Sequence, residues 1–281
     1  MERTSGTSNL TIALIDGPVA TGHPDLARER LREIPSGRVS ACLETNSAAC
    51  RHGTFVIGIL AARRSSAAPA ISPGCRFLIR AIFSEQVGGK QLPRATPEEL
   101  AEAIIQCIDA GARVINMSVA PAHPSISGER SLEEALDRAI RRGVIIVAAA
   151  GNQGVVGSSV ISRHPWVIPV VACDLQGIPL SYSNLGGSIG RRGLAAPGDA
   201  ITSLSPQGPP LTLGGTSVAA PFVTGAVALL WSLFPAATAA QIRLAVSGVA
   251  ARRRLAVVPP LLDGAAAYQE LLTASARRRR L

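Results

Sequence analysis

The order of hydrophobic patterns along the chain constrains its fold more than any other feature of the sequence. Short apolar runs rich in β-branched residues alternate with helical patterns, and the runs cover residues 11–15, 76–83, 113–119, 144–149 and 166–172. Alternation of this kind predicts a parallel sheet that is covered by helices on both faces. We therefore expect an α/β fold whose functional residues gather beyond the carboxyl ends of the strands.

Several helix starts are marked by side chains that can cap a first turn. Thr96-Pro97-Glu98-Glu99 has the pattern of a capping box with proline at the first helical position. Ser131-Leu132-Glu133-Glu134 repeats the pattern, with Ile140 expected on the buried face of its helix. Thr238-Ala239-Ala240-Gln241 opens a further helix. These signals predict helices between the apolar runs.

The composition excludes several classes of protein. The 281 residues are 47% hydrophobic and 17% charged, which is too apolar for a disordered chain. No uninterrupted apolar run is long enough to cross a bilayer, so we expect no membrane partner. The net charge is +9 and almost entirely arginine, since Lys90 is the only lysine. We interpret it as a compositional bias and expect no nucleic-acid partner.

The cysteines and the N-terminus point to a reducing compartment. The first nine residues are polar and lack the pattern of a secretory signal, which predicts a cytoplasmic protein. The five cysteines are Cys42, Cys50, Cys75, Cys107 and Cys173. Their odd number, without a C-x-x-C pair, favours free thiols and argues against a structural zinc site. A Cys42–Cys50 bridge stays open as the alternative.

Four residues beside glycines carry the chemistry. Asp16 ends the first apolar run, His52 precedes Gly53, Asn152 follows the fourth run, and Ser217 opens an apolar helix over residues 222–234. A serine hydroxyl needs a base to become a nucleophile, and histidine titrates near neutrality. A carboxylate can orient that histidine, and an amide can donate to an oxyanion.

Each of these residues has an ordinary structural explanation when it is taken alone. An aspartate ending a strand is commonly a turn residue, a His-Gly-Thr triplet a loop, a Gly-Asn pair a turn, and a Gly-Thr-Ser triplet a helix cap. Their joint order on an alternating α/β pattern favours catalysis. We therefore assign catalytic roles to Asp16, His52 and Ser217, with Asn152 as the oxyanion donor.

At this point the chain resembles the subtilisin-like serine proteases. The resemblance covers residues 11–247, and the matching blocks are residues 12–16, 52–54, 115–118, 148–154, 196–198 and 214–221. It implies a three-layer sandwich with a mostly parallel central sheet and helices on both faces. It also implies that Ser118, Val119, Ala120 and Gly151 bind an extended peptide substrate through backbone hydrogen bonds.

The departures from the family pattern narrow the expectation. Secreted members have Thr or Ser after the catalytic aspartate, whereas Asp16-Gly17-Pro18-Val19 is similar to the proteases that mature cyanobactins and related ribosomal peptides. The loop at residues 62–74 lacks the asparagine-rich pattern of the family's calcium site and carries Arg63 and Arg64. We expect no metal and no cofactor. The short stretch between Asn152 and Trp166 implies a shallow wall for the first specificity pocket.

The sequence thus predicts a serine endopeptidase that removes leader segments from a ribosomally made precursor peptide. A general intracellular protease and a catalytically silent peptide-binding module are the alternatives. The expected organisation is a flexible N-terminus at 1–9, a peptidase domain at 10–273 and a basic tail at 274–281. The resemblance also favours hydrolysis over transamidation, because the interval between Asp16 and His52 is too short for the capping helices that macrocyclising relatives insert there. The sequence does not determine the oligomeric state.

Overall fold

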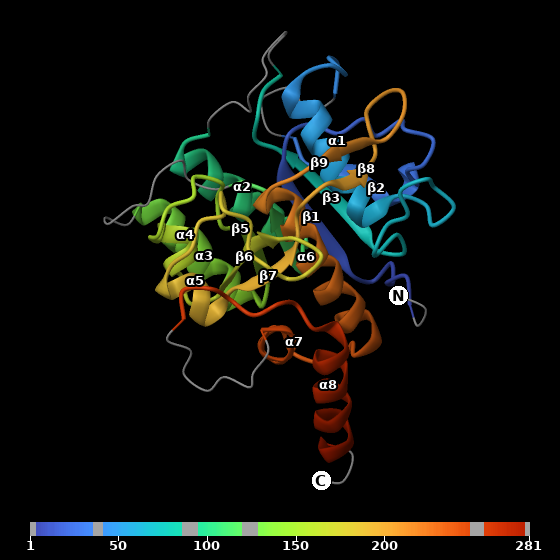
Figure 1. Cartoon of the computed structure of the whole chain (residues 1–281). Coiled ribbons are helices and arrows are strands. Elements are labelled where there is room, and N and C mark those ends of the chain that lie inside the picture. The colour runs from blue at the N-terminus through green and yellow to red at the C-terminus, as the bar shows by residue number, and fades with distance from the viewer. Residues whose placement is uncertain (1–3, 36–41, 86–94, 120–128, 248–255, 279–281) are drawn as a thin grey trace.

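The computed structural model describes residues 4–35, 42–85, 95–119, 129–247 and 256–278. A central sheet runs between layers of helices in Figure 1, and the C-terminal helix projects from the base of the molecule. The described strands form a seven-stranded sheet in the order β2-β3-β1-β4-β5-β6-β7, with every neighbouring pair parallel. The predicted α/β fold with a parallel sheet is therefore confirmed.

The sheet strands are short, and those at its centre are almost wholly buried. Their bounds are β1 Thr11–Asp16, β2 Leu31–Glu33, β3 Arg76–Ala81, β4 Val114–Met117, β5 Ile145–Ala149, β6 Val167–Cys173 and β7 Leu194–Pro197. All five predicted apolar runs form strands. The edge strands β2 and β7 were not predicted, because their residues, Leu-Arg-Glu and Leu-Ala-Ala-Pro, include no β-branched side chain.

Helices cover both faces of the sheet. On one face lie α2 (Pro97–Asp109) and α3 (Arg130–Arg142), and on the other lie α1 (Ala48–Ala61) and α6 (Thr216–Leu233). The remaining elements are η1 Arg28–Arg30, α4 Val160–Arg163, α5 Gly187–Arg192, α7 Ala239–Val246, α8 Gly264–Arg278 and the antiparallel pair β8 Ile201–Ser203 and β9 Leu211–Leu213. Two hydrophobic cores result, one on each face of the sheet.

Two predicted capping boxes form and one does not. The Thr96 and Glu99 pair caps α2, and the Thr238 and Gln241 pair caps α7. The box predicted at residues 131–134 is wrong, since α3 begins earlier, at Arg130, with no side-chain cap. Ile140 is also 38% exposed instead of buried.

The physical reason lies in the geometry of α3. Its buried stripe is made by Leu132, Ala135, Leu136 and Ala139, and Ile140 lies at the margin of that stripe. Because the helix starts at Arg130, Ser131 is already inside the first turn and cannot serve as the cap.

The central helix α6 begins at Thr216, so Ser217 lies inside its first turn and not before it. By length and composition this helix could cross a membrane, but 72% of its apolar window is buried inside the protein. It packs on strands β4 to β7 and on α1. Core packing therefore accounts for its hydrophobicity.

The register of three central strands prepares a site at their carboxyl ends. Ile15 of β1 lies beside Met117 of β4, which lies beside Ala148 of β5. The next residues along these strands are Asp16, Ser118 and Ala149, so the chain leaves all three strands at the same edge of the sheet.

Candidate active site

Strand ends and helix starts bring the four singled-out side chains into one cluster. Asp16 is the last residue of β1 and is fully buried, and His52 lies in the first half of α1. Ser217 is the second residue of α6, and Asn152 stands in the loop after β5. Hydrogen bonds connect Asp16, His52 and Ser217 directly, and Asn152 bonds the residue that precedes Ser217.

Two hydrogen bonds join a carboxylate, an imidazole and a hydroxyl. Nδ1 of His52 lies 2.7 Å from Oδ1 of Asp16, and Nε2 of His52 lies 2.9 Å from Oγ of Ser217. When Nδ1 donates its proton to Asp16, the lone pair on Nε2 faces the hydroxyl and can accept its proton. The arrangement can therefore activate Ser217 as a nucleophile.

The Asp16 carboxylate is fixed through one of its oxygens. The backbone N–H of Gly17 donates to Oδ1 at 2.6 Å, and the same oxygen accepts the bond from His52. Oδ2 is buried and has no hydrogen-bond partner among the described residues. Both bonds to Oδ1 hold the carboxylate in the orientation that faces the imidazole.

Two opposing effects set the pKa of His52. Burial lowers this pKa because it disfavours the imidazolium, whereas the charge of Asp16 and the hydrogen bond to it raise the pKa. The net result places the pKa of His52 above its ordinary value of 6.5. His52 is therefore a stronger base than a free histidine, and it is protonated at a higher pH.

Glycines allow α1 to approach the loop after β1 with no side chain between them. A Cβ on Gly53 would lie 2.5 Å from the carbonyl oxygens of both Gly17 and Pro18. A Cβ on Gly17 would lie 2.0 Å from the carbonyl oxygen of Ala49. Neither position has room for a methyl group. The glycine after Asp16, which departs from the pattern of secreted family members, is thus required by the packing of α1.

The first turn of α6 is shaped to receive negative charge. Gly215 caps the helix with a φ of 133°, a conformation that L side chains rarely adopt. Backbone N–H groups in a first turn have no partner within the helix, and the helix dipole is positive at this end. The amide of Ser217 lies in that turn.

Thr216 fixes the side chain of Asn152. Oδ1 of Asn152 accepts from both the N–H and the hydroxyl of Thr216, each at 2.9 Å. The amide nitrogen Nδ2 is thereby turned toward Gly215, where a Cβ would lie 3.1 Å from it. Thr216 was not predicted as a site residue. The available signal was the position of Thr216 between Gly215 and Ser217, but a threonine at that position is equally typical of a helix cap.

Asn184 organises the loop that carries Asn152, and it was also missed. Its Oδ1 accepts from the N–H groups of Gln153 and Val155, and its Nδ2 donates to the Ala150 carbonyl and the Gln153 side chain. Asn184 is 8% exposed. Nothing in the local sequence distinguishes it from a turn residue, because its partners lie about thirty positions away.

The predicted substrate strand is described only in part. Ser118 and Val119 follow β4 and are buried, whereas Ala120 lies outside the described residues. The N–H of Gly151 donates to Thr216 Oγ1, and its carbonyl accepts from the N–H of Asn184. The backbone of Gly151 is therefore engaged in shaping the loop itself.

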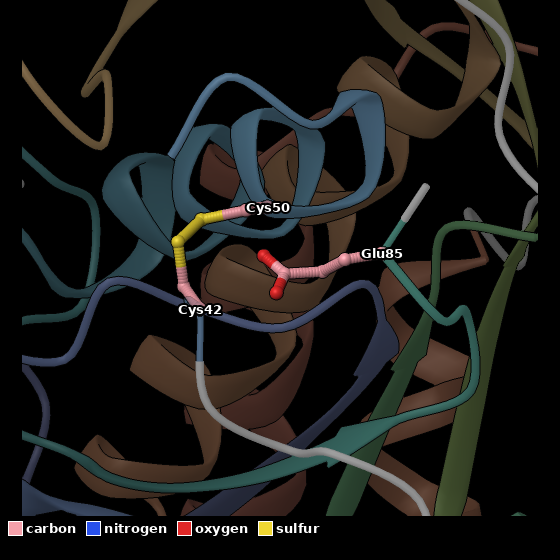
Figure 2. Close-up of side chains that lie close together, drawn as sticks. All are labelled: Cys42, Cys50 and Glu85. Carbon is pink, nitrogen blue, oxygen red and sulfur yellow. A yellow bond between two sulfur atoms is a disulfide. The ribbon is translucent and has the colours of Figure 1, made fainter. Parts of the chain in front are cut away.

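The favoured expectation of free thiols is wrong for two of the five cysteines. Cys42 and Cys50 form a disulfide with a Cα–Cα distance of 5.5 Å, shown in Figure 2, while Cys75, Cys107 and Cys173 are free and buried. Cys50 lies in the first turn of α1, two residues before His52. The bridge is the alternative that the sequence left open, and cysteine counting could not decide for it because the fold determines which thiols meet.

The disulfide lies beside Glu85, whose carboxylate points toward it in Figure 2. Glu85 accepts hydrogen bonds from the N–H groups of Leu43 and Glu44 and from the hydroxyl of Ser47. Ser47 also caps α1 by accepting from the N–H of Cys50. The sulfurs are bonded to each other and the carboxylate is occupied, so this group is a structural clamp on the start of α1.

The residues of the loop after α1 do not fit the calcium site that the resemblance would imply. Arg64 donates from Nη2 to the carbonyl oxygens of Thr4 and Ile71, at 3.0 and 3.2 Å. Asp25 is tied to the hydroxyl of Ser66. A guanidinium thus binds carbonyl oxygens of the kind that coordinate calcium.

Comparisons with known proteins point to one family. A model described as the Subtilase family matches residues 7–259. Subtilisin DY of Bacillus licheniformis is 30% identical over 248 residues, which cover 86% of this chain and 84% of that protein. Four longer subtilisins, 31–32% identical, are matched over 59% of their own length.

Two solved structures are similar over almost their whole length. A mutant of the protease domain of PatA has a TM-score of 0.88 and 31% identity, with 98% of this chain and 99% of that chain covered. The prenylagaramide maturation protease PagA has a TM-score of 0.82 and 28% identity, with 96% of each chain covered. Fold, family model and relatives agree, and the chain belongs to the subtilase family of serine endopeptidases.

Proposed function

We propose that Asp16, His52 and Ser217 form a catalytic triad that cleaves peptide bonds through an acyl-enzyme. The observation that carries the proposal is the continuous hydrogen-bond chain of 2.7 and 2.9 Å from a buried carboxylate to a half-buried hydroxyl. Oγ of Ser217 attacks the substrate carbonyl carbon while Nε2 of His52 takes the hydroxyl proton. Asp16 holds the tautomer and stabilises the imidazolium that forms.

The oxyanion and the leaving group are handled by the neighbouring groups. The side-chain amide of Asn152 and the backbone N–H of Ser217 donate to the carbonyl oxygen as it becomes negative. The imidazolium then gives its proton to the leaving amine, the C–N bond breaks, and an ester remains on Ser217. His52 takes a proton from water, which attacks this ester; the bond to Oγ then breaks, His52 returns the proton to Oγ of Ser217, and the new carboxylate leaves. We favour water over an amine as the acceptor, because only 36 positions separate Asp16 from His52.

The proposed biological role is leader removal from a ribosomally made precursor peptide. PagA and PatA, which are 28% and 31% identical to this chain, are maturation proteases for prenylagaramide and patellamide. The block Asp16-Gly17-Pro18-Val19 supports the same role. Peptide or protein substrates follow from the family, and the precursor is the finer proposal.

Features near Asn152 support recognition that extends beyond one pocket. The stretch that follows it is short, and the side chain of Val156 within it is 73% exposed. A shallow wall provides little selectivity at the first subsite, so the binding energy must come from several subsites and from remote segments. The net charge of +9 would attract a long acidic leader.

The test compares a tetrapeptide amide with a full leader-bearing precursor. We expect a much higher kcat/KM for the precursor, and a decrease with added salt for the precursor alone, because salt screens the attraction. Equal efficiency on both substrates, or no salt effect, would replace this role with that of a general intracellular protease. No turnover of any peptide, with no labelling of Ser217 by a fluorophosphonate, would leave a silent peptide-binding module.

A further inference from the structure

A proline inside α6 removes a hydrogen bond from the turn that carries Ser217. In an α-helix the carbonyl of one residue accepts from the N–H four positions later. The residue four positions after Ser217 is Pro221, which lies inside α6 and has no N–H. The carbonyl of Ser217 therefore lacks its usual helical donor.

A side chain from the central sheet supplies a donor to that carbonyl. The hydroxyl of Ser118, just beyond β4, donates to the Ser217 carbonyl oxygen at 3.1 Å. Ser118 is 4% exposed, so the bond is sheltered from water. The end of β4 is thereby joined to the residue that bears the nucleophile.

The direction of this hydrogen bond is set by two further buried side chains. Nδ2 of Asn116 donates to Oγ of Ser118 at 2.8 Å, which leaves the single hydroxyl proton of Ser118 for Ser217. Oδ1 of Asn116 accepts from the hydroxyl of Thr224 at 2.8 Å. Asn116 and Thr224 are both fully buried. The donors therefore run in one order, from Thr224 through Asn116 and Ser118 to the Ser217 carbonyl.

The fold explains how these residues meet. Side chains alternate along a strand, so Asn116 and Ser118 face the same side of β4 as Val114. Val114 belongs to the hydrophobic core that contains α6. Thr224 lies two turns into α6 on the side that meets β4. The chain of hydrogen bonds thus spans the packed boundary between strand and helix.

We propose that Ser118 is a positioning residue for the nucleophile. Its hydroxyl takes the place of the helical N–H that Pro221 lacks. The bond holds the first turn of α6, so that Oγ and the N–H of Ser217 keep their directions toward His52 and toward the oxyanion. Ser118 does not touch the reacting atoms. This inference rests on the proposed role of Ser217 as nucleophile, and it gives Ser118 a role distinct from backbone pairing with substrate.

Ser118→Ala tests the bond directly. We expect kcat to fall about tenfold with KM unchanged, because a hydrogen bond to a rigid buried partner is lost while the substrate-pairing backbone stays in place. The rate of Ser217 labelling by a fluorophosphonate should fall by a similar factor. A rise in KM alone, or unchanged labelling, would overturn the proposal.

A double-mutant cycle with Pro221→Ala makes the test specific. Alanine restores an N–H that can bond the Ser217 carbonyl, so Ser118→Ala should cost little in that background. An equal loss in both backgrounds would overturn the proposal. Labelling of Ser217 in the wild-type protein distinguishes failure of the triad proposal from failure of the proposal for Ser118. If the wild type is not labelled, the triad itself is wrong.

A second pair of variants serves if the Pro221→Ala protein does not fold. Thr224→Val keeps the shape of the side chain and removes its hydroxyl, whereas Thr224→Ser keeps the hydroxyl. We expect Thr224→Val to lower kcat several-fold, Thr224→Ser to retain most of the rate, and Thr224→Val to add little to Ser118→Ala. Full additivity of Thr224→Val with Ser118→Ala would count against the proposed order of donors.

Discussion

The two halves of the proposed catalytic cluster are built in different ways. The acid–base half, Asp16 and His52, depends on the absence of side chains, because Gly17 and Gly53 let two backbone segments touch. The nucleophile half depends on the presence of polar side chains, among which Thr216 fixes Asn152. The first half should therefore be sensitive to added atoms, and the second half to deleted hydrogen bonds.

The largest expected effect tests whether the two halves act together in cleaving a peptide bond. Ser217→Ala should lower kcat about a millionfold, the size known from subtilisin, because the nucleophile is lost and the rest of the site stays. Its melting temperature should match the wild type, since one hydroxyl is removed from an accessible position. Steady-state kinetics and fluorophosphonate labelling measure this. Substantial residual turnover would contradict the proposal that His52 activates Ser217 as the nucleophile.

Loss of a hydrogen-bond donor in the nucleophile half should weaken the stabilisation of the transition state. Asn152→Ala should lower kcat by about a hundred- to a thousandfold with little change in KM, as the equivalent loss does in subtilisin. Asn152→Asp keeps the size but loses the N–H donor, and should be as slow. A loss confined to KM would mean that Asn152 binds the substrate in its ground state.

A methyl group added in the acid–base half should displace His52 from its position beside Ser217. Gly53→Ala puts a methyl against two carbonyl oxygens, and we expect kcat to fall about a hundredfold, the size of loss that a displacement of about 1 Å can cause. Gly22→Ala is the matched control, because a Cβ there would meet nothing within 4 Å. Comparable losses in both variants would show that the tight contact is not what positions His52.

The raised pKa of His52 predicts the acidic limit of activity. Because Nε2 must be unprotonated to accept the Ser217 proton, kcat/KM should fall as the pH decreases through the pKa of His52. The midpoint should lie above pH 6.5, and below it the rate should fall about tenfold per pH unit. Asp16→Asn removes the charge that raises this pKa, so the midpoint of its residual activity should move to lower pH. A midpoint that stays in place would exclude Asp16 as the cause.

The disulfide should affect stability more than rate. It closes a short loop of eight positions at the start of α1, so its reduction should lower the free energy of unfolding by about 2–3 kcal/mol. The cap of Ser47 and its bond to Glu85 remain, so kcat should change little. Melting curves with and without dithiothreitol measure the effect, and Cys42→Ser should be insensitive to the reductant.

The remaining thiols make this comparison clean. Burial raises the pKa of Cys75 to about 11 and that of Cys107 to about 12, and it also raises the pKa of Cys173, so none of the three free thiols should readily enter a new disulfide. A wild-type melting temperature that does not respond to the reductant would show that the clamp rests on Glu85 and Ser47 alone.

Most of the central strands and two of the helix caps could be predicted from the sequence. The runs that became β1 and β3 to β6 were recognisable because a strand that is buried on both faces must be apolar along its length. The caps of α2 and α7 were recognisable because both partners lie within four residues. Signals of this kind are local, and for that reason a sequence displays them.

The predictions that failed concern features that depend on packing and not on a local pattern. Ile140 is exposed because it lies at the margin of the stripe of α3 that packs into the core. The Cys42–Cys50 bridge, which the sequence left open as the alternative, depends on the conformation of the eight-position loop at the start of α1, and an odd cysteine count has no bearing on that. Thr216 and Asn184 were missed because their partners come from other strands and loops.

The sequence by itself proposed the chemistry of Asp16, His52, Asn152 and Ser217, because the residue types, their order along the chain and the short blocks around them are all local features. Only the tertiary structure decided how those groups are held. The contact of Gly17 with α1 and the bond from Ser118 to the Ser217 carbonyl join segments far apart in the chain. Their geometry follows from strand register and helix packing, which depend on the whole core at once and not on any local pattern.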